Sequence, residues 1–280
     1  MKIIMDRNIH AAGQLFDALG TVQRLDGRQI SPKDVRDADA LIVRSVTPAG
    51  EALLKNSTVR FVGTTTIGTD HLDIPWLEAN GIKWASAPGC NADAASQYTL
   101  AMILLACRRL SLRADQLRYG IVGLGNVGSR LKRLLEALGA SVVANDPPLQ
   151  DQGEPGLVDL SEALSADVVC LHIPLSLDGP YPTYHMIAQQ QLAAMKEGAL
   201  IVNTSRGGVI NGSDLASELR TGRLRAALDV WPTEPEVDPE LLRLSTVATP
   251  HVAGYSDDGK FNGARMIYQS FCEWSGHTPN

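Results

Sequence analysis

Three side chains of types suited to alcohol oxidation each follow a segment that is predicted to be a buried strand. Arg206 comes directly after "LIVNTS", Glu234 lies within "LDVWPTEPE", and His251 lies within "VATPHVAGY". In an open α/β sheet, ligands bind outside the carboxyl ends of the strands. We therefore expect these three side chains to face the same cleft, and they are the candidate catalytic residues.

The three residue types fit hydride transfer from the C2 carbon of a 2-hydroxy acid. The guanidinium of Arg206 can hold a carboxylate through paired hydrogen bonds. The imidazole of His251 can take a proton from a hydroxyl group and return it. The carboxylate of Glu234 can orient that imidazole and raise its pKa. For a single histidine the alternative is a purely structural role, so the prediction depends on the set of three.

The segment "YGIVGLGNVGSRLKRLLEALG" has the pattern of a strand, a tight glycine turn and a helix. Gly123, Gly125 and Gly128 have the G-x-G-x-x-G spacing, and Asp146 ends the next predicted strand. This spacing permits the turn, lets the backbone approach a pyrophosphate and lets the helix pack on the strand. An acidic residue binds ribose hydroxyls and would repel a 2′-phosphate, so NAD is the predicted cofactor; a structural turn is the alternative. The predicted cofactor-binding residues here are Gly123, Gly125, Asn126, Val127, Gly128 and Asp146.

Short apolar strands alternate with helical patterns along the chain, which predicts βαβ units and parallel sheets. The first set of strands includes "MKIIMD", "ADALIVRS", "VRFVGTTT" and "IKWASAP", and the second runs from "YGIVG" to "TVATPHV". We expect an α/β protein of two domains. Residues 1–92 would form a flavodoxin-like substrate (lid) domain, with 256–280 packing back on it. Residues 93–255 would form a Rossmann-type NAD-binding domain.

Composition excludes several other classes of protein. The 280 residues carry a net charge of −6, and the basic residues are scattered, so we expect no nucleic-acid partner. The most apolar run, "YTLAMILLAC", is too short to cross a bilayer, and the N-terminus has no apolar signal core. The cysteines are far apart and no histidine pair has metal-ligand spacing, so we predict no disulfide framework and no metal. A cytoplasmic protein is expected.

These motifs resemble those of the D-2-hydroxyacid dehydrogenases over essentially the whole chain. The segments "SRGGVI", "LDVWPTEP" and "TPHVAG" are similar to the Arg, Glu and His signatures of that family. Other stretches resemble the members that act on 4-phospho-D-erythronate, where the wider family more often has asparagine in place of His71. These stretches are "LIVRSVT", "FVGTTTIGTDHLD", "APGCNA", "NDPP", "DGPYPTYHMI" and "HVAGYS".

The resemblance implies NAD-dependent oxidation of 4-phospho-D-erythronate to 2-oxo-3-hydroxy-4-phosphobutanoate, in the route to pyridoxal phosphate (vitamin B6). Arg206 would hold the C1 carboxylate and the C2 oxygen, His251 would remove the C2 hydroxyl proton, and Glu234 would pair with His251. One alternative is a related dehydrogenase acting on 3-phosphoglycerate, glycerate or lactate. An alternative of another class is an NAD-sensing, corepressor-like binding protein.

Further contacts follow from the same resemblance. Ser45, Thr66 and Tyr255 match positions that contact the substrate, whereas Asp229 and Gly254 match positions near the nicotinamide end of the cofactor. Arg44 is a candidate for meeting the negative charge of the substrate, with a plain surface arginine as the alternative. The expected partners are a phosphorylated hydroxy acid and a second copy of the chain, as a homodimer. Similar proteins continue into a dimerising C-terminal domain, which would begin where this sequence ends.

Overall fold

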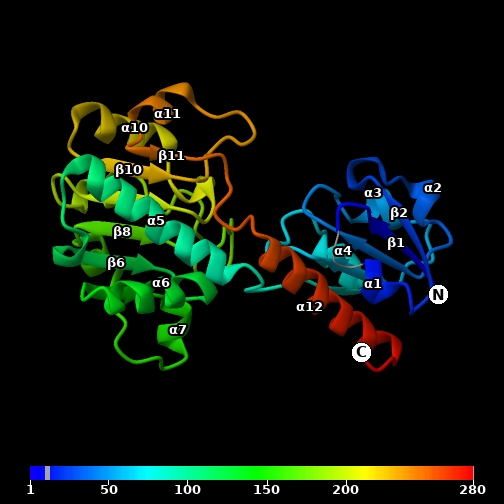
Figure 1. The fold of residues 1–280 in the computed structure, drawn as a ribbon. Coiled ribbons are helices and arrows are strands. Elements are labelled where there is room, and N and C mark those ends of the chain that lie inside the picture. The colour runs from blue at the N-terminus through cyan, green and yellow to red at the C-terminus, as the bar shows by residue number, and fades with distance from the viewer. Residues whose placement is uncertain (10–12, 280) are drawn as a thin grey trace. The chain divides into compact units, whose positions relative to one another are not determined.

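The computed structural model describes residues 1–9 and 13–279 and divides into two compact units (Figure 1). Unit 1 comprises Met1–Asn91 and Tyr255–Asn280, and unit 2 comprises Ala92–Gly254. Each unit contains a parallel β-sheet, which confirms the predicted fold class of an α/β protein with two parallel-sheet domains.

The sheet of unit 1 has the strand order β2-β1-β3-β4-β5, which is the flavodoxin-like order. Its strand β2 is absent from the sequence prediction. That strand lies at the edge of the sheet and has no fully buried residue, so its sequence, "TVQRL", lacks the apolar run that identifies the others. The strands are β1 (Lys2–Asp6), β2 (Thr21–Leu25), β3 (Ala40–Val43), β4 (Phe61–Thr64) and β5 (Lys83–Ala85).

Helices cover both faces of the unit 1 sheet. Alternate residues of each strand point to opposite faces, so Ile3 and Met5 join one apolar cluster and Ile4 joins the other. The long helix α12 (Asp257–Ser275) buries Ile267 and Phe271 in the first cluster, and Figure 1 shows it in red next to α1 (Gly13–Phe16). The opposite face packs against α2 (Pro32–Val35), α3 (Glu51–Leu54) and α4 (Ile74–Ala79).

The sheet of unit 2 has the strand order β11-β10-β9-β8-β6-β7. Beyond β7, Ala144 forms a parallel bridge with Leu157, which occupies the place of the third strand in a Rossmann sheet. The strand order reverses between β6 and β8, and such reversals are where dinucleotides bind. The strands are β6 (Arg118–Val122), β7 (Ser141–Asn145), β8 (Val168–Leu171), β9 (Leu200–Asn203), β10 (Arg225–Leu228) and β11 (Val247–Ala248).

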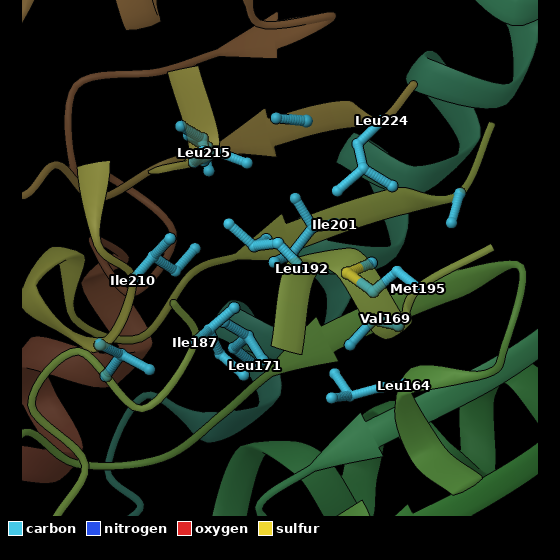
Figure 2. Close-up of a cluster of buried hydrophobic side chains, with 14 of the residues drawn as sticks. Leu164, Val169, Leu171, Ile187, Leu192, Met195, Ile201, Ile210, Leu215 and Leu224 are labelled. Carbon is cyan, nitrogen blue, oxygen red and sulfur yellow. The ribbon is translucent and has the colours of Figure 1, made fainter. Parts of the chain in front are cut away.

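Both faces of the unit 2 sheet are also buried. On one face α5 (Ala92–Leu110) and α6 (Asn126–Ala137) cover residues such as Val168 and Val202. The other face carries Val169 and Ile201, which Figure 2 shows among leucines and isoleucines from the surrounding helices and loops. The helices on that face are α8 (Leu160–Leu164), α9 (Gln189–Ala194), α10 (Gly212–Thr221) and α11 (Pro239–Leu244).

The described part of the chain contains no helix with the length and apolar character needed to span a membrane.

Candidate active site

The carboxyl ends of three neighbouring strands in unit 2 are in register. Asn203 at the end of β9 pairs with Leu228 of β10, and Leu228 pairs with Ala248 of β11. The segments that follow these strands therefore leave the sheet at one edge. They carry Arg206, Glu234 and His251, respectively.

The side chains of His251 and Glu234 form a hydrogen-bonded pair. Nδ1 of His251 lies 2.7 Å from Oε2 of Glu234, and Oε1 of Glu234 accepts a 2.8 Å hydrogen bond from the N–H of Trp231. Because the ionised carboxylate can only accept, Nδ1 carries a proton and Nε2 of the neutral imidazole has the free lone pair. Among the residues that the structure describes, none is hydrogen-bonded to Nε2.

This pairing moves the two pKa values in opposite directions. The hydrogen bond to Glu234 raises the pKa of His251 above its usual value, against the opposing effects of burial and of the Arg206 charge. Burial acts to raise the pKa of Glu234, but the hydrogen bonds from His251 and Trp231 outweigh it, and the net shift is downward. The site therefore holds an ionised carboxylate beside an imidazole that can accept a proton.

Arg206 is close enough to this pair for its charge to lower the pKa of both partners. The loop that carries it packs tightly on the loop after β10. A Cβ added to Gly207 would lie 1.9 Å from the carbonyl oxygen of Trp231, so only glycine permits this approach. Unit 2 thus brings together the three side chains singled out from the sequence.

Asp229 is fully buried and fixes the loop that carries His251. Its Oδ1 accepts hydrogen bonds from Thr249 Oγ1 at 2.6 Å and from the N–H of Val252 at 2.9 Å, and its Oδ2 accepts one from the N–H of Ala253 at 2.8 Å. His251 itself has a φ of 56°, in the left-handed region, which costs a non-glycine residue about 1 kcal/mol or more. The buried carboxylate stabilises the loop in this conformation.

The three glycines of the turn after β6 differ in their steric surroundings. Gly123 has a φ of 92°, and a Cβ there would lie 2.5 Å from the carbonyl oxygen of His172. A Cβ on Gly128 would lie 2.0 Å from the carbonyl oxygen of Gly123. A Cβ on Gly125 would meet nothing within 4 Å, so this residue borders open space at the start of α6.

The first turn of α6 offers N–H groups toward that open space. Asn126, Val127 and Gly128 are the first residues of the helix, and their N–H groups have no acceptor within it. No side chain caps the helix at Gly125. A bare helix N-terminus beside a glycine without steric cover suits the close approach of a pyrophosphate.

Asp146 ties the end of β7 to the glycine turn. Its Oδ2 accepts a 2.8 Å hydrogen bond from the N–H of Leu124, and its Oδ1 accepts a 3.1 Å hydrogen bond from the N–H of Leu149. Each carboxylate oxygen keeps a further lone pair that can accept from a ribose hydroxyl. The glycine turn, the helix N-terminus and this carboxylate together fit NAD.

In unit 1, Arg44 follows β3 and is held by the last residue of β1, Asp6. Nε of Arg44 donates a 2.9 Å hydrogen bond to Oδ2 of Asp6, whose side chain is fully buried, whereas the Arg44 side chain is 30% exposed. The ion pair fixes the orientation of the guanidinium. The Nη atoms of Arg44 have no hydrogen-bond partner among the described residues. Ser45, next in the chain, is exposed. Asp6 is not among the site residues predicted from the sequence, although a carboxylate that ends the apolar segment "MKIIM" is a visible signal.

Thr66 lies just beyond β4, the strand next to β3. It therefore lies on the side of the sheet where the strands have their carboxyl ends, as Arg44 does. Its Oγ1 donates a 3.1 Å hydrogen bond to the carbonyl oxygen of Gly68 and lies 2.7 Å from Oγ1 of Thr64. Thr64 Oγ1 lies in turn 2.9 Å from Nε2 of His71. From the sequence, His71 is only a feature of the resemblance, and this hydrogen-bond network is not predicted.

The last two residues expected from the sequence lie where the units divide. Gly254 ends unit 2, and Tyr255 begins the C-terminal part of unit 1 with 72% of its surface exposed. Nζ of Lys260 lies 3.7 Å from the centroid of the Tyr255 ring. Within the described part of unit 1, no hydrogen bond joins Tyr255 to Ser45 or Thr66.

The sequence of the chain is similar to those of known proteins. Residues 102–253 match the family model for the NAD binding domain of D-isomer specific 2-hydroxyacid dehydrogenases. The chain is 45% identical to the erythronate-4-phosphate dehydrogenase of Cellvibrio japonicus over 280 residues, which cover 100% of this chain and 73% of that protein. It is 47% identical to the enzyme of that name from Teredinibacter turnerae over 279 residues, covering 99% and 74%.

Among solved structures, the fold is similar to that of NAD⁺-bound 3-phosphoglycerate dehydrogenase from Entamoeba histolytica. The TM-score is 0.85 at 22% identity, over 99% of this chain and 95% of that one. A likeness at this identity shows that the fold is shared. The family match and the relatives that align with the whole of this chain show common ancestry. The chain therefore belongs to the D-isomer specific 2-hydroxyacid dehydrogenase family and carries its NAD-binding domain.

Proposed function

We propose that this chain oxidises 4-phospho-D-erythronate at C2 with NAD, giving 2-oxo-3-hydroxy-4-phosphobutanoate, as a step toward pyridoxal phosphate. Relatives named erythronate-4-phosphate dehydrogenase, 45% and 47% identical over almost the whole chain, support this choice of substrate. The observation that carries the chemistry is the His251–Glu234 pair, with Nε2 open and the charge of Arg206 beside it.

In the proposed reaction, Nε2 of His251 removes the proton of the C2 hydroxyl group. The imidazolium that forms keeps its Nδ1–H bonded to Glu234, whose negative charge stabilises it. Arg206 holds the C1 carboxylate and the C2 oxygen through its planar guanidinium, which orients the alcohol. NAD, when bound, supplies the acceptor for the C2 hydride. The same residues work in reverse when the 2-oxo acid is reduced.

NAD is proposed to bind through the turn and helix that begin at Gly123. Asp146 would accept hydrogen bonds from the ribose hydroxyls, and its charge disfavours a 2′-phosphate. Asp229 and Gly254 are proposed to lie toward the nicotinamide end. The pyrophosphate would be bound by Gly123, Gly125, Asn126, Val127 and Gly128.

In unit 1, Arg44, Ser45, Thr66 and Tyr255 are proposed to contact the substrate. Arg44 is the cation suited to the phosphate group, because Asp6 engages its Nε and leaves the outer guanidinium edge for an anion. Ser45 and Thr66 offer hydroxyl groups at the same edge of the sheet.

A substrate panel tests the proposed function. Formation of NADH is followed with 4-phospho-D-erythronate, 3-phosphoglycerate, glycerate and D-lactate. We expect 4-phospho-D-erythronate to have the highest kcat/KM, and a preference for any of the other acids would replace the proposed substrate. His251→Ala should abolish turnover while NAD still binds. If turnover continued in this variant, His251 would not be the base. A chain that binds NAD but oxidises none of these acids would instead match the corepressor-like alternative.

We also propose that the protein acts as a homodimer in the cytoplasm. Exposed leucines on and just after α5 support the homodimer, because a second copy could cover them. Leu104, Leu105 and Leu112 are 43%, 41% and 40% exposed. The four cysteines are unpaired, as is usual in a reducing compartment. Sedimentation equilibrium of the wild type tests the dimer, and a single monomeric species at assay concentration would refute it.

A further inference from the structure

A continuous hydrogen-bond network leads from His71 to Thr66 at the edge of the unit 1 sheet. Nε2 of His71 contacts Oγ1 of Thr64 at 2.9 Å, Thr64 contacts Oγ1 of Thr66 at 2.7 Å, and Thr66 donates to the carbonyl oxygen of Gly68 at 3.1 Å. Thr64 is fully buried, so no solvent competes for its hydroxyl group. The carbonyl oxygen of His71 accepts the N–H of Ala49 at 2.8 Å, which anchors the start of the network.

The number of protons fixes the direction of every bond in this network. A carbonyl oxygen can only accept, so Thr66 uses its single hydroxyl proton on Gly68. Thr64 must then donate to Thr66, and its own oxygen can take a proton only from His71. Burial lowers the pKa of His71, so the imidazole is neutral near pH 7 and its one N–H must be at Nε2.

With its proton engaged and one lone pair taken by Thr64, Thr66 has one lone pair left on Oγ1. A substrate hydroxyl group can donate to that lone pair. A phosphate oxygen at neutral pH is mainly an acceptor, so it would bind Thr66 only if Thr66 gave up its bond to Gly68.

We propose that His71 is a positioning residue that makes Thr66 a hydrogen-bond acceptor, so that Thr66 recognises a hydroxyl group of the substrate and not its phosphate. This inference rests on the proposed function, which places Thr66 at the substrate. In 4-phospho-D-erythronate the hydroxyl group that does not react is at C3. The network therefore selects acids that carry a 3-hydroxyl group.

The test compares variants of His71 with two substrates. The substrates are 4-phospho-D-erythronate and its 3-deoxy analogue, (R)-2-hydroxy-4-phosphobutanoate. His71→Leu removes the donor. His71→Gln retains one, because the glutamine amide nitrogen can reach the place of Nε2. His71→Asn is the matched control, since its amide nitrogen corresponds to Nδ1 and falls short of Thr64.

The wild type should prefer the hydroxylated substrate. His71→Leu and His71→Asn should lower kcat/KM for that substrate by about 3- to 10-fold, the value of one neutral hydrogen bond, mainly through KM. These two variants should leave kcat/KM for the 3-deoxy analogue and the dissociation constant of NAD unchanged. His71→Gln should restore most of the preference for the hydroxylated substrate. Thr64→Val with Thr64→Ser as its control tests the same network from the next residue, should a His71 variant fold poorly.

The possible results separate the two proposals. Equal losses with both substrates, or no rescue by His71→Gln, would show that His71 only supports the loop and would overturn the inference. Unchanged kinetics in all the variants would do the same while leaving the proposed function intact. If the wild type does not oxidise 4-phospho-D-erythronate at all, the proposed function fails, and the inference fails with it.

Discussion

Replacing Asp229 by asparagine tests whether this buried carboxylate holds the His251 loop in place. The substitution keeps the shape of the side chain and changes one oxygen into an NH₂ group. In the native loop Oδ1 accepts from Thr249 and Val252, and Oδ2 accepts from Ala253. Every one of these partners is a donor, so the carboxylate is matched to its surroundings and an amide is not.

The amide oxygen of the variant can occupy only one of the two oxygen positions. If the oxygen takes the Oδ1 position, the NH₂ group faces the N–H of Ala253. If the oxygen takes the Oδ2 position, the NH₂ group faces the N–H of Val252. In either orientation a backbone donor loses its acceptor. A hydrogen bond to a charged group contributes about 1.5–3 kcal/mol, and a buried donor without a partner costs about 1–3 kcal/mol. Allowing for relaxation of the loop, we expect the loop to be destabilised by about 2–4 kcal/mol.

Hydrogen exchange at the amides of Val252 and Ala253 measures this loss locally, which suits a chain of two units better than a single unfolding midpoint. A loss of 2–4 kcal/mol corresponds to exchange that is about 30- to 900-fold faster. The measurement is made without NAD, so a lost cofactor contact cannot account for the effect. Asp178→Asn, at an exposed position in the same unit, is the control for the loss of one charge. Exchange rates within twofold of the wild type would refute the reasoning. Activity should also fall by about 10²-fold, because His251 would no longer be held in register.

Other substitutions separate the remaining roles. Glu234→Gln removes the partner that raises the pKa of His251; because the neutral imidazole is the form active in oxidation, the acid limb of the kcat/KM profile should move to lower pH, and an unmoved limb would contradict the pairing. Gly125→Ala should weaken NAD binding with little change in melting temperature, since its Cβ meets nothing, whereas Gly128→Ala should lower both, since its Cβ would lie 2.0 Å from a carbonyl oxygen. Calorimetric titration with NAD and thermal melts check this difference, and equal effects would argue against it. Arg44→Met should raise KM for the phosphorylated acid by at least about 10-fold, because it removes a charge-assisted hydrogen bond to the phosphate. KM for glycerate should not change. An equal effect on the two acids would show that Arg44 does not bind the phosphate.

The parts of the fold that could be predicted from the sequence are those that are specified locally. Strands such as β8 and β9 are buried on both faces, so they appear as short continuous apolar runs. The glycine turn has fixed spacing because a single strand–turn–helix unit determines it. The edge strand β2 lacks such a signal, since neither of its faces is fully buried, and the prediction missed it.

The candidate site divides in the same way. Arg206, Glu234 and His251 could be selected because each follows an apolar strand, and parallel strands end at one edge of a sheet. The pairing of Arg44 with Asp6 joins residues 38 positions apart in the sequence. The direction of the His71 network depends on which hydroxyl group meets a carbonyl oxygen. Such contacts depend on distances that only the folded chain defines, so no local sequence pattern predicts them.

The hydrogen bonds that place the two sets of polar side chains are internal to their own units. His251 is held by Glu234 and by the loop that Asp229 fixes, all of which follow β10 and β11 in unit 2. Thr66 is held through a network from His71, which belongs to the loop after β4 in unit 1. Because neighbouring strands of a single sheet assemble each set, we expect substitutions at His71 to alter the proposed hydroxyl recognition without disturbing the His251–Glu234 pair. Such a division would let the preferred acid change while Arg206, Glu234 and His251 stay the same.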